Sequence, residues 1–157
     1  MSSRRCTVAL AAVGAMALLA GCGGGSSRLT KAQYEQRVQK DAAALTKATS
    51  GIGTSTSSFS DLQKVVTSAQ SGIEAAAKDL ESLKPPQEAE NANKAFVAAL
   101  RAIESDFKAM ATALKKHDLT KIVALVQQLG GSKEVAAAKR AAADLAKKGY
   151  HLGAFSS

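Results

Sequence analysis

From residue 30 onward, apolar residues recur at spacings of three and four, which is the period of an α-helix. The most regular stripe alternates steps of four and three, as in helices that pack at a shallow angle. It comprises Leu62, Val66, Ala69, Ile73, Ala76, Leu80 and Leu83. A second stripe of the same kind comprises Ala92, Phe96, Leu100, Ile103, Phe107, Met110 and Leu114. The pattern predicts helices and no strands.

Capping and turn residues set the limits of the first three helices. The sequence T-K-A-Q at 30–33 has the form of a capping box. The helix that it starts carries an apolar side of Tyr34, Val38, Ala42, Leu45 and Ala48, and Gly51-Ile52-Gly53 ends it. Ser60 to Gln63 repeats the capping box, and Pro85-Pro86 separates the second helix from the third.

The last part of the chain predicts two short helices. Asp118 is a suitable N-cap for the first, whose inward side is Ile122, Leu125, Val126 and Leu129. Gly130-Gly131 interrupts the pattern, and Ser132 caps the last helix, with Val135, Ala138, Ala142 and Leu145 inward. Gly149 ends that helix and leaves a short tail.

Four long stripes with short connections predict an all-α fold, an antiparallel up-down four-helix bundle whose last arm is broken at Gly130-Gly131. Alanine at many inward positions brings the helices close together and leaves no room for a large cofactor. The acidic residues are expected on polar faces, in pairs such as Glu74 with Lys78.

The first 20 residues have a different character. Met1–Arg5 carries two positive charges and no acid, and an apolar run follows from Val8 to Ala20. A membrane-spanning helix needs about 20 apolar residues, so this shorter run predicts an export signal instead.

The run ends in Leu19-Ala20-Gly21-Cys22, which resembles the lipobox of bacterial lipoproteins. The resemblance implies cleavage between Gly21 and Cys22, with a diacylglyceryl group on Cys22. It divides the chain into a signal peptide (1–21), a lipidated cysteine with a flexible Gly/Ser tether (22–29) and a helical bundle domain (30–157). The expected location is the extracytoplasmic face of the cell membrane. Arg4-Arg5 leaves twin-arginine export open, although Thr7 favours the route for unfolded chains.

A longer segment adds a second resemblance. Leu80–Glu90, which contains Pro85-Pro86, and the following Phe96–Leu100 are similar to the centre of small, uncharacterised actinobacterial lipoproteins. The ending Gly149–Gly153 is similar to theirs, although some of them follow it with a cysteine that this chain lacks. The resemblance implies a fold and a location but no activity.

Motifs for catalysis or cofactor binding are absent from the sequence. Loss of Cys6 with the signal and acylation of Cys22 would leave no thiol for a disulfide or a metal. The sequence has no Cys-x-x-Cys-His, no Glu-x-x-His, no nucleophile elbow and no Walker loop. We therefore expect neither an enzyme nor a bound metal or cofactor, with haem binding by His151 and a methionine left open.

Positive charge is the remaining signal. The chain carries a formal net charge of +8, and removal of Arg4 and Arg5 would leave +6. The excess lies in the C-terminal part, as a candidate basic patch of Lys115, Lys116, Lys121, Lys139, Arg140, Lys147 and Lys148. Such a patch suits an envelope protein, an anionic lipid or a wall polymer, and equally a merely solvated face. Nucleic acid is not expected for an exported protein without interleaved aromatic residues.

Two functions are compatible with these features. The first is a membrane-anchored, non-catalytic interaction or envelope-structural module. The alternative is a carrier of a small ligand or cofactor in the bundle core.

Overall fold

The computed structural model describes residues 27–51, 58–129 and 131–153 of the chain. Regular structure in these ranges is helical throughout, as the sequence predicts. The elements are α1 (Lys31–Thr49), α2 (Phe59–Ser82), the short 3-10 helix η1 (Gln87–Ala89), α3 (Glu90–Lys115), α4 (Leu119–Gln128) and α5 (Lys133–Lys147).

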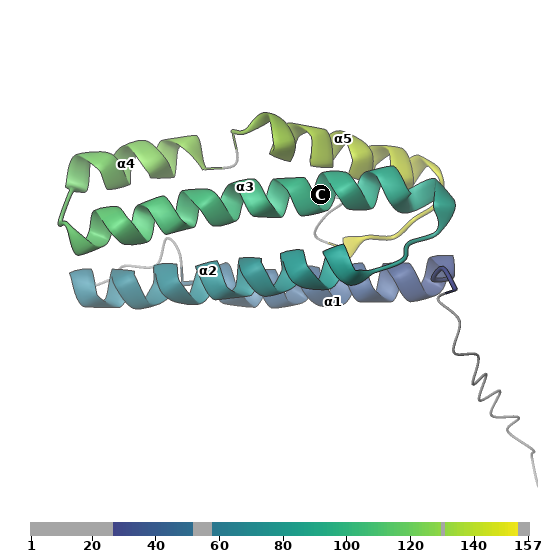
Figure 1. The fold of residues 1–157 in the computed structure, drawn as a ribbon, viewed down its shortest axis with the longest axis horizontal. Coiled ribbons are helices and arrows are strands. Elements are labelled where there is room, and N and C mark those ends of the chain that lie inside the picture. Colours follow the sequence, from purple (N-terminus) through teal and green to yellow (C-terminus); the bar gives the residue numbers. More distant parts are fainter. Residues whose placement is uncertain (1–26, 52–57, 130, 154–157) are drawn as a thin grey trace, which may run out of the picture.

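Helix α3 is the centre of the bundle. It packs against α2, α4 and α5, while α1 packs against α2. Figure 1 shows α4 and α5 placed end to end along α3. With 26 residues, α3 is about 39 Å long, which α4 and α5 together nearly match. The predicted helical bundle with a broken last arm is confirmed.

Three of the four predicted helix caps are confirmed. The Thr30 hydroxyl accepts a hydrogen bond from the Gln33 backbone N–H, and the Gln33 side chain accepts one from the Thr30 N–H. Asp118 and Ser132 cap α4 and α5.

The predicted cap at Ser60 is wrong, because α2 begins two residues earlier. Ser58 is the N-cap and accepts a hydrogen bond from the Asp61 N–H at 3.1 Å. The earlier start includes Phe59 in the helix, and the Phe59 ring lies 5.0 Å from the ring of His117. The local sequence pattern around residue 60 cannot predict this contact, because His117 is distant in the chain.

Helices α3 and α5 end in the same type of turn. Gly149 follows α5 with φ +77°, its N–H donates to Ala146 O, and the Tyr150 N–H donates to Leu145 O. This is the Schellman arrangement, so the prediction that Gly149 ends the last helix is confirmed. His117 occupies the corresponding position after α3, with φ 53°.

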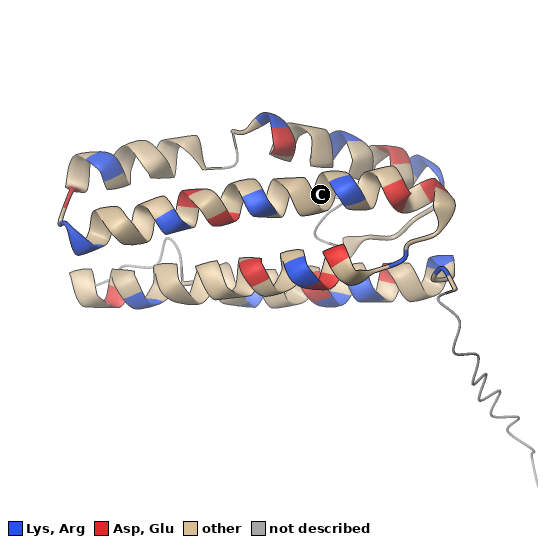
Figure 2. Ribbon diagram, viewed as in Figure 1, with Lys and Arg blue, Asp and Glu red and all other residues tan. Residues whose placement is uncertain are grey.

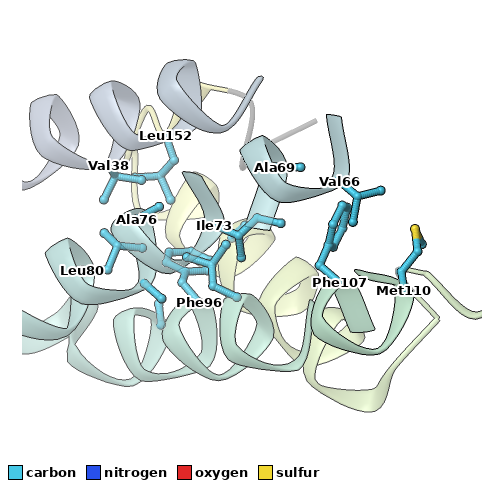
Figure 3. Packing of buried hydrophobic residues seen from close by; sticks show 14 of the residues in the cluster. Val38, Val66, Ala69, Ile73, Ala76, Leu80, Phe96, Phe107, Met110 and Leu152 are labelled. Carbon is cyan, nitrogen blue, oxygen red and sulfur yellow. The ribbon is translucent and has the colours of Figure 1, made fainter. Parts of the chain in front are cut away.

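The predicted stripes of α2 and α3 supply half of the buried core residues (Figure 3), and Leu62, Leu83 and Ile103 of these stripes are partly buried. The largest fully buried side chains are Tyr34, Tyr150, Phe96, Phe107, Leu80, Leu145, Leu152, Val38 and Val66. One inward assignment on α4 is wrong: Val126 is 56% exposed, like Leu119 and Val123. Only Ile122 and Leu125 of α4 are buried, since this short helix packs with one side against α3.

The segment after α5 is packed against α1. Tyr150 and Leu152 are almost completely buried, and in Figure 3 Leu152 points into the core together with Val38. The His151 carbonyl accepts a hydrogen bond from the Gln39 side chain at 2.6 Å, and the His151 N–H donates to Glu35 at 2.9 Å. This segment joins the last helix to the first.

Acidic residues do not all lie on polar faces as expected. Glu74 does pair with Lys78, at 2.6 Å. Glu104, however, is only 4% exposed and is compensated by Arg101 at 2.9 Å and Lys108 at 2.6 Å. Asp41 is also buried, 6% exposed, within the contact between α1 and α2.

Small residues allow α1 to approach α2 closely. A Cβ atom on Gly72 would lie 2.5 Å from the Cβ of Ala48, so only glycine fits there. Helices α1 and α2 run antiparallel, with Ala48 opposite Gly72. In the same register, Asp41 on α1 lies opposite Asp79 on α2. The two carboxyl groups are hydrogen-bonded to each other, and burial, followed by the charge of Asp79, raises the pKa of Asp41 to about 6. One oxygen of each has no partner among the described residues.

Candidate functional site

The predicted cleavage and lipidation residues, Gly21 and Cys22, lie outside the described residues. The nearest described part of the chain is fixed to the Pro85-Pro86 turn. The Leu29 N–H donates to Lys84 O at 2.7 Å, and the Arg28 guanidinium donates to Pro85 O at 3.1 Å. The path toward residue 22 therefore starts from the end of the bundle where α2 meets α3.

A groove of about 640 Å³ lies beside the same turn. Its apolar lining residues are Leu83, Pro85, Val97 and Ala98, and charged side chains also line it. The lining residues are Arg28, Glu81, Leu83, Lys84, Pro85, Glu90, Asn93, Lys94, Val97 and Ala98.

Most charges around the groove are paired within the protein. Glu90 lies 3.0 Å from both Arg28 and Lys94, and hydrogen bonds from Lys94 and then Arg28 lower its pKa. Glu81 pairs with Arg101 at 2.7 Å. Lys84 makes no ion pair with the described residues. An apolar surface with one unpaired cation suits a small apolar molecule that carries a negative charge. The lining contains no serine, threonine, cysteine or histidine.

The seven residues of the candidate basic patch are all exposed, but they do not gather at one point. Lys115 and Lys116 lie at the end of α3, Lys121 lies in the first turn of α4, and the other four lie in the middle and at the end of α5. Figure 2 shows blue and red bands alternating along α5, whereas α4 carries a single blue band near its start. The four basic residues in the middle and at the end of α5 are Lys139, Arg140, Lys147 and Lys148. Within the described structure, Lys147 alone of the seven makes an ion pair, with Asp144 at 3.2 Å.

The geometry excludes a haem iron held by His151 and Met110. The Tyr150 hydroxyl donates to Glu88 at 2.6 Å, which places the C-terminal segment near the start of α3. Met110 lies 20 residues beyond Glu90 on α3, about 30 Å away, and is buried in the core. The described residues also contain no group of three or more side chains suited to a metal ion.

Two features with functional potential were not predicted. One is the apolar flank of α4, formed by Leu119, Val123 and Val126. Their spacing of four and three was a visible signal, since it gives α4 a second stripe beside Ile122 and Leu125. The other is the buried Asp41. It lies seven residues after Tyr34 and three after Val38, and therefore on the inward stripe of its helix.

Comparison with known protein families, curated proteins and solved structures finds no match for this chain. In the described part of the chain, no helix has both the length and the apolar character needed to cross a bilayer.

Proposed function

We propose that this chain is a bacterial lipoprotein whose helical domain acts at the membrane as a non-catalytic interaction or envelope-structural module. The observation that carries the proposal is Leu19-Ala20-Gly21-Cys22 at the end of a short apolar run. Cleavage before Cys22 and acylation of its thiol would attach the mature chain to the extracytoplasmic face of the cell membrane. Two or more acyl chains make such attachment stable, whereas one is marginal.

The position of the folded domain supports this proposal. The chain is bound to the bundle from Arg28 onward, six residues after Cys22. The intervening Gly23–Ser27 contains only glycine and serine, the composition of a flexible linker. Six residues span at most about 20 Å, so a lipid on Cys22 would keep the bundle at the membrane surface.

The chain offers a matched pair of variants to test the anchor. Cys22→Ser removes the proposed lipid acceptor, and Cys6→Ser removes the other cysteine, which would be lost with the signal. In bacterial cells fed a radiolabelled fatty acid, we expect the label in the parent chain and in Cys6→Ser, both in the membrane fraction. Cys22→Ser should lose the label. Equal labelling of both variants, or of neither, would contradict the proposal.

The interaction role rests on the exposed cations at the end of α3, at the start of α4 and along α5. Six of these seven side chains make no ion pair within the described structure, so their charge is available to an envelope protein, an anionic lipid or a wall polymer. The groove beside Pro85 favours a second candidate, the binding of a small anionic and apolar molecule. Native mass spectrometry tests it: a bound molecule should be present in the parent protein and lost from Val97→Arg, which would fill the groove.

A further inference from the structure

One exposed flank of α4 is apolar. Leu119, Val123 and Val126 are 59, 55 and 56% exposed, and at 100° per residue they lie along one flank of the helix. These three residues, the α4 flank, make up most of the large hydrophobic side chains that the described structure leaves exposed; Phe59 is the other. Figure 2 shows α4 almost free of charge, whereas the long helices carry blue and red along their length.

Unpaired positive charge accompanies the α4 flank. Lys115 and Lys116 end α3 directly before the turn into α4, and both are exposed. Lys121 is exposed on the opposite flank of α4. Of the acidic groups near this end of the bundle, Asp118 caps α4 and Asp61 lies 3.3 Å from Lys64, whereas Asp106 on α3 makes no ion pair with the described residues. A surface that combines aliphatic side chains with unpaired lysines complements an anionic lipid headgroup layer over an apolar interior.

A second copy of the chain fits this flank poorly. The exposed parts of three aliphatic side chains offer roughly 300 Å² or less, against about 800 Å² per partner in a stable interface. Two copies would also bring their unpaired lysines together. A tethered protein, by contrast, meets the lipid surface at a high effective concentration, so a small contact area is sufficient.

We propose that the α4 flank contacts the anionic lipid surface to which the chain is tethered, so that the bundle lies on its side. The proposal rests on the proposed function, because the tether supplies the proximity. Arg28 and the start of α4 lie at opposite ends of the bundle (Figure 1), separated by about the 39 Å length of α3. A linker of about 20 Å allows both ends to reach the bilayer only when the long axis lies within about 30° of the membrane plane.

The test uses the full chain, expressed in bacteria, labelled with a fatty acid and purified from membranes. If Cys22 is acylated and Cys6 removed, a cysteine introduced at position 123 is the only reactive thiol. The fluorophore NBD is attached to Val123→Cys or to the control Ser71→Cys. Ser71 is exposed on α2, which lies on the other side of α3 from α4 (Figure 1). Each protein is incorporated into vesicles that contain phosphatidylglycerol and nitroxide-labelled phosphatidylcholine.

We expect the nitroxide lipid to quench the fluorophore at position 123 at least about twofold more than at position 71. Equal quenching at positions 123 and 71 in acylated protein would overturn the proposal. A blue-shifted emission at position 123 without quenching would also overturn it, because it would show that protein, and not lipid, covers the α4 flank. Absence of the fatty-acid label would instead refute the tether, and with it the premise of the contact.

The charge contribution is tested in the same vesicles. Lys115→Glu with Lys116→Glu should reduce quenching at position 123. Lys40→Glu with Lys47→Glu makes the same change of net charge on exposed positions of α1 and should leave quenching unchanged. An equal reduction by both pairs, or by neither, would overturn the role of Lys115 and Lys116.

Discussion

The buried carboxyl pair of Asp41 and Asp79 makes the stability of the bundle depend on pH in an unusual direction. Burial and the neighbouring Asp79 raise the pKa of Asp41 from 3.8 to about 6. Between these two pH values, Asp41 holds a proton in the folded chain that it releases in the unfolded chain. A raised folded-state pKa means that the stabilisation is complete below about pH 4 and is lost as the pH rises through 6. At 1.36 kcal/mol per pKa unit, the loss from this group is about 3 kcal/mol.

Asp41→Asn removes the titrating group and retains a side chain that can donate a hydrogen bond to Asp79. We expect the variant to be more stable than the parent at pH 7.5, by about 1–3 kcal/mol, and to differ from it much less at pH 4.5. The comparison between variants isolates this group, because Glu104 and other carboxyl groups with lowered pKa values titrate equally in both proteins.

The assay is urea denaturation followed by circular dichroism at several pH values between 4.5 and 8. Asp144→Asn serves as a matched control, because Asp144 is exposed and its ion pair with Lys147 is a surface pair of small value. A parent protein whose advantage over Asp41→Asn grows as the pH rises from 5 to 7.5 would refute the reasoning.

Three further results are expected. Gly72→Ala should destabilise the bundle by about 1–3 kcal/mol despite the better helix propensity of alanine, and Ala48→Gly in the same chain should recover part of the loss. Urea denaturation measures both effects, and a stabilised Gly72→Ala variant would contradict the close approach of α1 and α2. Leu152→Ala should cost about 2–5 kcal/mol in the same assay, because its side chain is fully buried, whereas a free tail would lose nothing. A variant that combines Lys139→Glu, Arg140→Glu, Lys147→Glu and Lys148→Glu reverses the charge along α5. It should stay membrane-bound but lose the cross-link to a neighbouring protein that the parent forms reproducibly in membranes. An unchanged cross-link would exclude these cations from the contact.

The sequence was sufficient for the features that depend on local pattern. The stripes of α2 and α3 were predicted because each inward residue follows the last by three or four positions, and the Thr30–Gln33 capping box is complete within four residues. Ser58 and Ser60 offer equivalent caps for α2. In the structure Ser58 is the cap, hydrogen-bonded to Asp61, and the helix that starts there includes Phe59, whose ring meets His117, 58 residues away in the chain.

The features that the sequence did not predict depend on which helices and segments pack against each other. Tyr150 and Leu152 follow a helix-ending glycine and resemble a tail, yet they fill the space beside α1. Val126 was placed inward because the pattern cannot tell how many neighbours a ten-residue helix has. The sequence identifies the basic residues individually, but their spread from the end of α3 to the end of α5 follows from the end-to-end placement of α4 and α5.

The most direct test of the central proposal is the mass of the first peptide of the mature protein. Trypsin cleaves after Arg5 and Arg28, so the sequence between them reports both processing and modification. We expect a peptide that runs from Cys22 to Arg28 and carries a diacylglyceryl group on Cys22. Recovery of an unmodified peptide from Cys6 to Arg28, or of a mature N-terminus other than Cys22, would contradict it.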